Sequence, residues 1–201
     1  MLSPYTESEY FQRQVIFMNQ YTIIAGVNGT GKSSLRGVLE GQGVNLGHII
    51  DPDQIAKKHQ MDTIKAGRQA LAEIDGCLRR NSSFTQETTL SGHRIEKNLQ
   101  QARRQGYYIV LYYIGLSSAQ ESLLRIENRV RKGGHDIPPG DVKRRFSRRW
   151  NDLKRVFPYC DEVIFYDNEN GFVKVAEYKN SQLNFYGDYR PDWLEDFLKT
   201  L

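Results

Sequence analysis

Cysteine is scarce in this 201-residue chain, which contains only Cys77 and Cys160. The two residues are far apart in the sequence, and no cluster of Cys and His has the spacing of a zinc site. We therefore expect no disulfide framework, and we expect both thiols to be buried and reduced. Long apolar runs are also missing, because none reaches the roughly 18 residues that a membrane span requires.

Recognisable targeting and hydrolase signals are absent as well. The first residues, MLSPYTESEYFQRQVIF, lack the basic start and apolar core of a secretory signal, which predicts a cytoplasmic protein with no membrane partner. The N-K-x-D motif of GTPases and the long apolar strand of mechanical ATPases, which ends in Asp or Asp-Glu, are both missing. Because Met18 stands just ahead of the first expected strand, we predict an N-terminal extension at 1–17, with a start site set too early as the alternative, and one domain at 18–201.

A phosphate-binding loop is what the chain does contain. Residues 26–34, GVNGTGKSS, match the pattern G-x-x-x-x-G-K-[ST] at every fixed position, between an apolar run and a helical pattern. Backbone N–H groups of such a loop and the helix N-terminus surround phosphate oxygens. Lys32 is expected to reach the β- and γ-phosphates of ATP, and the Ser33 hydroxyl to bind Mg²⁺. The predicted nucleotide-binding residues are Gly26, Asn28, Gly29, Thr30, Gly31, Lys32, Ser33 and Ser34. The alternative is a glycine-rich turn with an exposed lysine.

Strand and helix patterns alternate along the rest of the chain. Strands are expected at 21–25, 47–50, 83–86, 107–114, 161–166, 172–178 and 182–186, and helices at 32–40, 63–79, 92–105, 117–131 and 192–200. This alternation predicts an α/β fold with a doubly wound, mostly parallel sheet of the P-loop kinase kind. The pair at 172–186 is expected to form an antiparallel C-terminal edge. Ligands of such sheets bind at the carboxyl ends of the strands.

Two carboxylates follow the second expected strand. Asp51 and Asp53 form a D-x-D pair, in which one carboxylate can help to hold Mg²⁺ and the other can orient and deprotonate an attacking hydroxyl. The alternative is that both merely cap the next helix, since Asp is a favoured N-cap residue. The position one strand after the phosphate loop favours the functional interpretation.

The segment Glu87-Thr88-Thr89 follows the third expected strand. Its carboxylate and two hydroxyls are suited to hold a polyhydroxylated substrate. The residues alone support equally well a capping box in which Thr88 or Ser91 begins the following helix. The sequence leaves these two interpretations open at this point.

Positive charge is concentrated in residues 125–155, which contain eleven Lys and Arg against four Asp and Glu, whereas the rest of the chain has a net charge of −3. Glycine and proline pairs interrupt a helical pattern around His135 and Asp136, and Asp141 is expected to cap a second helix. A core-facing side of that helix is predicted from Val142, Phe146, Trp150 and Leu153. An arginine-rich helix–loop–helix with glycine hinges is typical of a lid over transferring phosphates, here at about 129–150. The alternative is a solvated basic face.

Together these motifs resemble the zeta toxin family of small kinases, in a shorter branch with GGHDIP in the lid. The resemblance runs from about residue 23 to 168 and is carried by AGVNGTGKSS, IIDPD, ETTLSG, IGLSS, RVRKGGHDIPPGDVKRRF and YDN. It implies an ATP-dependent kinase that phosphorylates a hydroxyl of UDP-N-acetylglucosamine or a related UDP-sugar. Such a kinase is the toxin of a toxin–antitoxin system and is restrained by a small antitoxin protein.

The resemblance also implies residue roles. Asp53 is the expected catalytic base, and Asp51 is assigned to the metal and the substrate. Glu87 and Thr89 match substrate contacts of the family. The expected catalytic cations, which neutralise charge on the transferring phosphate, are Lys32 of the loop and Arg129 and Arg145 of the lid, with Arg144 as a rival.

Two other functions compete with this one. A nucleotide or polynucleotide-end kinase would use the same loop and hold nucleic acid along the basic segment 125–155. A regulatory module would bind ATP without turnover. Nucleic-acid grooves usually interleave aromatic and basic side chains, and here only Phe146 and Trp150 intervene, both expected to face inward. The sequence therefore favours a small-molecule kinase and disfavours nucleic acid as a partner.

Overall fold

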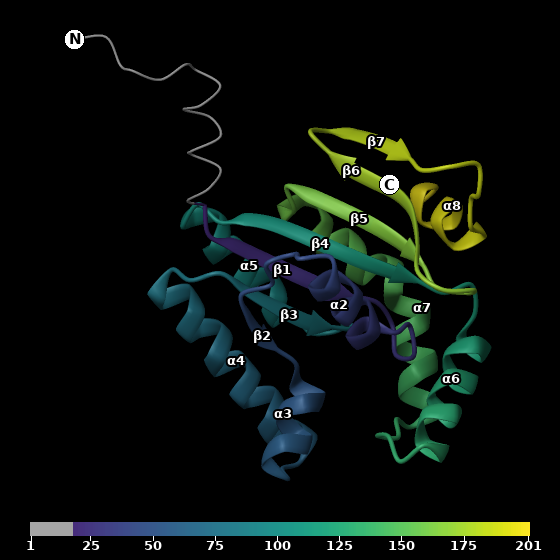
Figure 1. The fold of residues 1–201 in the computed structure, drawn as a ribbon, viewed down its shortest axis with the longest axis horizontal. Coiled ribbons are helices and arrows are strands. Elements are labelled where there is room, and N and C mark those ends of the chain that lie inside the picture. The colour runs from purple at the N-terminus through teal and green to yellow at the C-terminus, as the bar shows by residue number, and fades with distance from the viewer. Residues whose placement is uncertain (1–17) are drawn as a thin grey trace.

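The computed structural model describes residues 18–201, so the expected extension at 1–17 lies outside the described part (Figure 1). Its seven-stranded sheet has the order β2-β3-β1-β4-β5-β6-β7. The strands are β1 (Gln20–Ala25), β2 (His48–Ile50), β3 (Phe84–Thr88), β4 (Tyr108–Gly115), β5 (Glu162–Asp167), β6 (Val173–Lys179) and β7 (Gln182–Phe185). The pairs β5–β6 and β6–β7 are antiparallel, and the other pairs are parallel. The expected mostly parallel sheet with an antiparallel C-terminal edge is confirmed.

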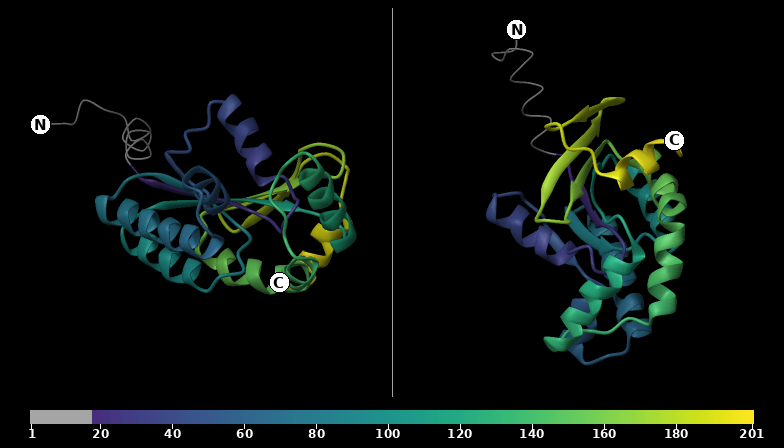
Figure 2. Two further views of the ribbon diagram at one scale, coloured as in Figure 1. Left: turned by 90° about the horizontal axis from the view of Figure 1, so that it is seen from below. Right: turned by 90° about the vertical axis from the view of Figure 1, so that its right-hand side faces the viewer.

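The helices cover the two faces of this sheet unequally (Figure 2). They are α2 (Lys32–Gly41), α3 (Pro52–His59), α4 (Thr63–Arg80), α5 (Arg94–Arg104), α6 (Ala119–Arg131), α7 (Pro139–Val156) and α8 (Asp192–Leu198), with a 3₁₀ turn at Phe157–Tyr159. Ile23 of β1 belongs to the large core with residues of α4, α5, α7 and α8, whereas Ile24 packs with Leu35 and Leu39 of α2. Successive strand residues thus serve opposite layers.

β1 is an interior strand of the sheet, with β3 on one side and β4 on the other. Its last residue, Ala25, is paired with Thr88 of β3 and with Tyr113 of β4. The loop that follows β1 therefore leaves the central carboxyl edge of the sheet and lies beside the end of β3. The topology places the phosphate loop where side chains from neighbouring strands converge.

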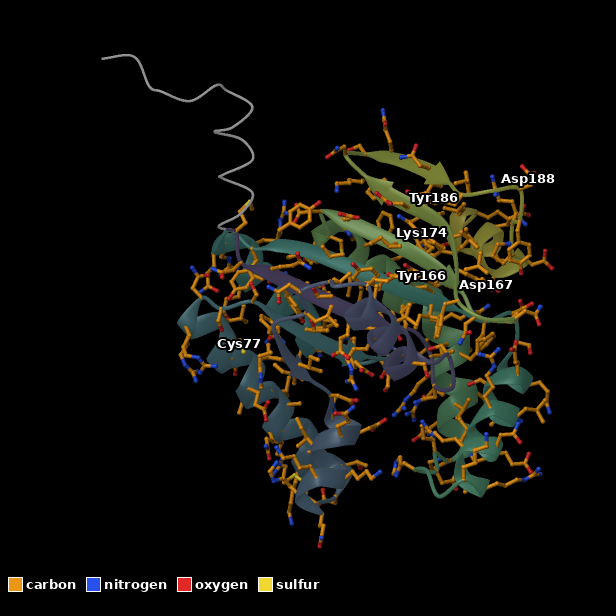
Figure 3. All side chains as sticks on the ribbon, viewed as in Figure 1. Cys77, Tyr166, Asp167, Lys174, Tyr186 and Asp188 are labelled. Carbon is orange, nitrogen blue, oxygen red and sulfur yellow. The ribbon has the colours of Figure 1, made fainter. Side chains whose placement is uncertain are left out.

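The C-terminal part of the sheet carries polar and aromatic side chains. Tyr166, Lys174 and Tyr186 lie along β5, β6 and the end of β7 (Figure 3), and the Lys174 ammonium lies 4.2 Å from the centre of the Tyr186 ring. Both thiols are free; Cys77 of α4 is buried as expected, whereas Cys160 is only partly buried, although desolvation still raises the pKa of Cys160 to about 12. No helix within residues 18–201 combines the length and apolar character needed to cross a membrane.

The structure differs from the expected elements in two places. Helix α3 was missed, and Ile55 is the buried residue among its eight. Asp141 does not cap α7, which begins at Pro139 with Pro138 as its N-cap residue.

A glycine at the end of β4 determines how closely α8 packs on the sheet. A methyl group on Gly115 would lie 2.2 Å from Cδ2 of the buried Trp193. We expect Gly115→Ala to lower the free energy of unfolding by about 2–3 kcal/mol through overpacking, as measured by urea denaturation. Gly37→Ala is the control, because Gly37 is exposed on α2 with no atom within 4 Å of a new methyl group, and it should raise stability by about 0.5–1 kcal/mol. Equal effects of the two changes would contradict this account.

Candidate active site

A cavity of about 530 Å³ opens at the carboxyl ends of β1, β2 and β3. Residues of α3 and α6, which project below the sheet in Figure 1, line it from different sides. The sequence-predicted site residues that line it are Asn28, Gly29, Gly31, Lys32, Ser33, Ser34, Asp51, Asp53, Glu87, Thr89, Arg129 and Arg145. The other two, Gly26 and Thr30, belong to the loop but do not line the cavity.

The phosphate loop has a backbone shape that requires glycine. Gly29 and Gly31 have φ of 78° and 91°, in the left-handed region that residues with a side chain rarely adopt. A methyl group on Gly29 would also lie 2.8 Å from the carbonyl oxygen of Ser122. Between them, the buried Thr30 hydroxyl donates to the Val27 carbonyl at 3.0 Å. Thr30 therefore stabilises the loop conformation from the side that faces away from the cavity.

Side chains from distant segments hold this loop in place. The Ser122 hydroxyl of α6 donates to the Asn28 carbonyl, and the Asn168 amide, after β5, donates to the Thr30 carbonyl at 2.8 Å. Arg145 of α7 donates to the Asn28 side-chain oxygen at 2.9 Å. Three segments, each more than ninety residues later in the chain, therefore hold the loop in place.

Lys32 occupies the first turn of α2 with its side chain folded over the loop. Its ammonium donates to the carbonyl oxygens of Gly26 and Val27 at 3.0 and 3.2 Å. Burial lowers the pKa of Lys32 to about 8, although nearby carboxylates oppose the shift. A bound phosphate would add negative charge here and favour the protonated form.

A buried ion-pair cluster lies beneath the loop. Glu87 accepts from the Ser33 hydroxyl at 2.9 Å and from Arg36 of α2 at 2.7 Å. The same Arg36 nitrogen lies 3.7 Å from Asp51. Burial raises the pKa of both carboxyl groups, and repulsion by Asp51 adds to the effect on Glu87. Arg36 opposes these shifts and keeps the two acids compatible.

The structure distinguishes Asp51 from Asp53, since only one of the two carboxylates caps a helix. Asp51 does cap α3, because its carboxylate accepts from the backbone N–H groups of Asp53 and Gln54 at 2.9 and 3.3 Å. The Asp53 side chain takes no part in this cap and lies exposed on the cavity wall. The cap interpretation therefore holds for Asp51 and not for Asp53.

The capping-box interpretation of the segment after β3 was wrong. Helix α5 begins at Arg94, and its N-cap residue is His93, without a side-chain cap bond. Thr88 accepts instead from the backbone of Leu90 at 3.0 Å, and the Thr89 and Ser91 hydroxyls lie 2.9 Å apart. Thr89 thus presents a hydroxyl at the cavity beside Glu87.

The lid arginines differ in where they lie. Arg129 and Arg145 line the cavity, and each has a buried Nε atom without a protein partner among the described residues. Arg144, the rival, pairs with Asp141 at 2.9 Å, and its side chain is 63% exposed. Arg149 stacks on Phe146 and Trp150, at 3.8 and 4.1 Å from the two ring centres. The geometry therefore favours Arg145 over Arg144.

Two arginines in or beside the cavity were missed from the sequence. Arg36 follows Lys32 by four residues on α2, and Arg125, which lines the cavity, precedes Arg129 by four residues on α6. Arg125 donates to Glu121 and to the Asn168 carbonyl, so it also joins α6 to the loop after β5. Helical i, i+4 spacing from a residue already selected was the available signal.

The donor chemistry of the cavity suits a hard cation. Within residues 18–201, no group of three His, Cys, Asp or Glu side chains forms a metal site. Ser33, Asp51 and Glu87 nevertheless offer oxygen atoms only. Mg²⁺ in phosphoryl-transfer sites uses few protein ligands and completes its shell with water and phosphate oxygens. The residues present fit such an ion.

Comparisons of the sequence with known proteins found a relative but no family profile. No known protein-family profile matches the chain. A Haemophilus influenzae protein, described as uncharacterized, is 34% identical over 136 residues, which cover 65% of this chain and 95% of that protein.

Among solved structures, a chain of the PezAT chromosomal toxin–antitoxin system of Streptococcus pneumoniae has a TM-score of 0.58 at 16% identity, covering 98% of this chain and 93% of that one. The AvrRxo1-ORF1:-ORF2 structure with ATP has a TM-score of 0.64 at 16% identity, covering 93% of this chain and 64% of that one. The chain therefore has a P-loop kinase-like fold, and the likeness expected to the zeta toxin family is confirmed at the level of the fold.

Replacing Arg36 tests whether the buried ion-pair cluster stabilises the fold. Arg36→Met would leave Glu87 and Asp51 buried without their cation, and we expect the free energy of unfolding at pH 7 to fall by about 3 kcal/mol. The measurement is urea denaturation without nucleotide. Adding Glu87→Gln to this variant removes one buried charge and should restore part of the loss. A cost below about 0.5 kcal/mol, the level of an exposed pair, would contradict the account.

Proposed function

We propose an ATP-dependent kinase activity with an alcohol group as acceptor for this chain, which belongs to the same family as the uncharacterized Haemophilus influenzae protein. One observation carries the proposal. Lys32 of the phosphate loop, Asp53 of α3 and the lid residues Arg129 and Arg145 line a single cavity, although they come from four separate elements. A cation cluster facing one exposed carboxylate is the arrangement that phosphoryl transfer to a hydroxyl needs.

ATP would bind with its phosphates on the loop between Gly29 and Ser34. Lys32, Arg129 and Arg145 supply positive charge on the side of the loop, and Arg145 is already joined to it through Asn28. Ser33 and Asp51 are the residues that would hold Mg²⁺, which supplies charge neutralisation of the phosphates when bound. Glu87 orients the Ser33 hydroxyl for this role.

Transfer follows from these positions. The acceptor hydroxyl lies toward Asp53, Glu87 and Thr89, and its oxygen attacks the γ-phosphorus while its proton passes to the Asp53 carboxylate. The bond from the γ-phosphorus to the β–γ bridging oxygen breaks, and ADP leaves. The lysine and the two lid arginines stabilise the charge that develops on the transferred group and on ADP.

UDP-N-acetylglucosamine or a related UDP-sugar is the proposed acceptor, and a toxin role restrained by a small antitoxin is the proposed biology. The sequence resemblance supports the acceptor, and the match to the PezAT toxin–antitoxin system supports the role. Such a kinase would act inside the cell that makes it. A polynucleotide acceptor is less well supported, because no Phe, Tyr or Trp is among the described residues that line the cavity, and Trp150 packs against the core.

The direct test is incubation with labelled ATP and a panel of nucleotide sugars, nucleotides, oligonucleotides and simple sugars. We expect label on a nucleotide sugar, and we expect Lys32→Ala to abolish transfer with its fold intact by circular dichroism, because Lys32 serves the phosphates. Label on an oligonucleotide would overturn the small-molecule assignment. ATP binding without any transfer would indicate a regulatory module.

The cellular arm of this test uses controlled expression in bacteria. The wild-type chain alone should slow growth with accumulation of a phosphorylated UDP-sugar, while Lys32→Ala should be harmless. If the two chains are equally benign and no nucleotide sugar is modified, the toxin role fails and a housekeeping kinase is the better account.

Asp53 is the proposed base, so its removal should affect chemistry more than binding. Asp53→Asn should reduce kcat by about 10² or more while the Kd for ATP changes by only a few-fold. Asp51→Asn is the comparison, because an asparagine can still accept the two cap bonds of α3. A larger loss of kcat in Asp51→Asn, with binding of ATP and Mg²⁺ intact, would reverse the two assignments.

A further inference from the structure

We propose that Gly134 is a positioning residue for Arg129, a role that rests on the proposed kinase activity. A methyl group on Gly134 would lie 2.5 Å from Cγ of Arg129 and 2.9 Å from its carbonyl oxygen. These atoms belong to the base of the side chain and to the backbone, so they cannot move aside as the tip of a long side chain can. The arginine stem lies against the bare α-carbon of the glycine.

The guanidinium of Arg129 is held by His135, the residue that follows Gly134. Nη2 of Arg129 donates to the carbonyl oxygen of His135 at 2.7 Å. The backbone at 134–135 therefore contacts Arg129 twice, at its stem and at its guanidinium. These two contacts aim the guanidinium into the cavity that Lys32 also lines.

The backbone around Gly134 is itself tied down and cannot easily yield to a new side chain. The N–H groups of Gly133 and Gly134 donate to the carbonyls of Val130 and Arg129 at 2.8 and 2.9 Å, which closes the end of α6. Three residues further on, Ile137 is 7% exposed and packs with Ile126 and Val142. Since both ends of the segment are anchored, an added methyl group must displace Arg129.

The neighbouring glycine provides a matched control. Gly133 has φ of 81°, so it requires glycine for its backbone conformation, but no atom lies within 4 Å of a methyl group placed on it. Gly134 is the reverse case, because its backbone is not in the left-handed region and only the contact with Arg129 opposes a side chain. The two glycines of the GGHDIP segment thus have different roles, of which only the second concerns the guanidinium.

The experiment compares Gly134→Ala, Gly133→Ala, Arg129→Ala and the double variant Arg129→Ala/Gly134→Ala in phosphoryl transfer and in ATP binding. We expect Gly134→Ala to lower kcat by about 10- to 100-fold, because a small misplacement of a charge-stabilising group is costly. The Kd for ATP should stay within about threefold. Gly133→Ala should retain kcat within about twofold at a temperature where it is folded.

The double variant tests the route of the effect. If Gly134 acts through Arg129, the double variant loses no more kcat than Arg129→Ala alone. Additive losses, or equal losses in Gly133→Ala and Gly134→Ala, would show a general effect on the lid and overturn the inference.

A crystal structure of Gly134→Ala decides the question without activity. We expect the bond from Arg129 Nη2 to the His135 carbonyl to be broken or moved, and an unmoved Arg129 would overturn the inference. Failure of the proposed function is a separate result, in which the wild-type chain transfers phosphate to no acceptor, and the crystal structure still decides the role of Gly134.

Discussion

The buried ion-pair cluster of Arg36 with Glu87 and Asp51 joins three chain segments beneath the phosphate loop. Arg36 belongs to α2, Glu87 to the end of β3, and Asp51 caps α3, so one guanidinium relates the loop to the two neighbouring strand ends. Two buried carboxylates this close would otherwise repel each other. Ser33, oriented by Glu87, and Asp53, placed by the capped turn of α3, both depend on this charge balance.

The basic segment 125–155 divides into parts with different tasks. Only three of its arginines line the cavity: Arg125, Arg129 and Arg145. Others form pairs with acids of the same helix, as Arg131 does with Glu127, or remain exposed. A small core of Ile126, Ile137 and Val142 joins α6, the intervening loop and α7, so this part of the segment has its own packing beside the main core. The segment therefore contains both cavity-lining arginines and a solvated basic face.

Patterns of short range account for most of what the sequence predicted correctly. The phosphate loop, the alternation of strands and helices and the antiparallel C-terminal edge all follow from spacing within about ten residues. The helix expected at 117–131 begins at Ala119, and the hydroxyl of its N-cap residue Ser118 accepts from the N–H of Glu121 at 3.1 Å. Helix α3 was not predicted from the sequence, because it buries only one residue. Its stability comes from the N-cap of Asp51 and from contact with α4 rather than from its own pattern.

The sequence by itself determined the phosphate loop and the set of candidate side chains at the strand ends, because those depend on local order along the chain. Only the tertiary structure shows that Arg145 and not Arg144 lines the cavity, that Asp51 and not Asp53 caps α3, and that Gly134 and not Gly133 lies against Arg129. Each difference depends on what a side chain or a bare α-carbon meets in the fold: Asn28 for Arg145, the backbone N–H groups of α3 for Asp51, and the stem of Arg129 for Gly134. Residues close in sequence share composition but not surroundings; on α7, a rotation of about 100° per residue turns Arg144 and Arg145 to different sides of the helix.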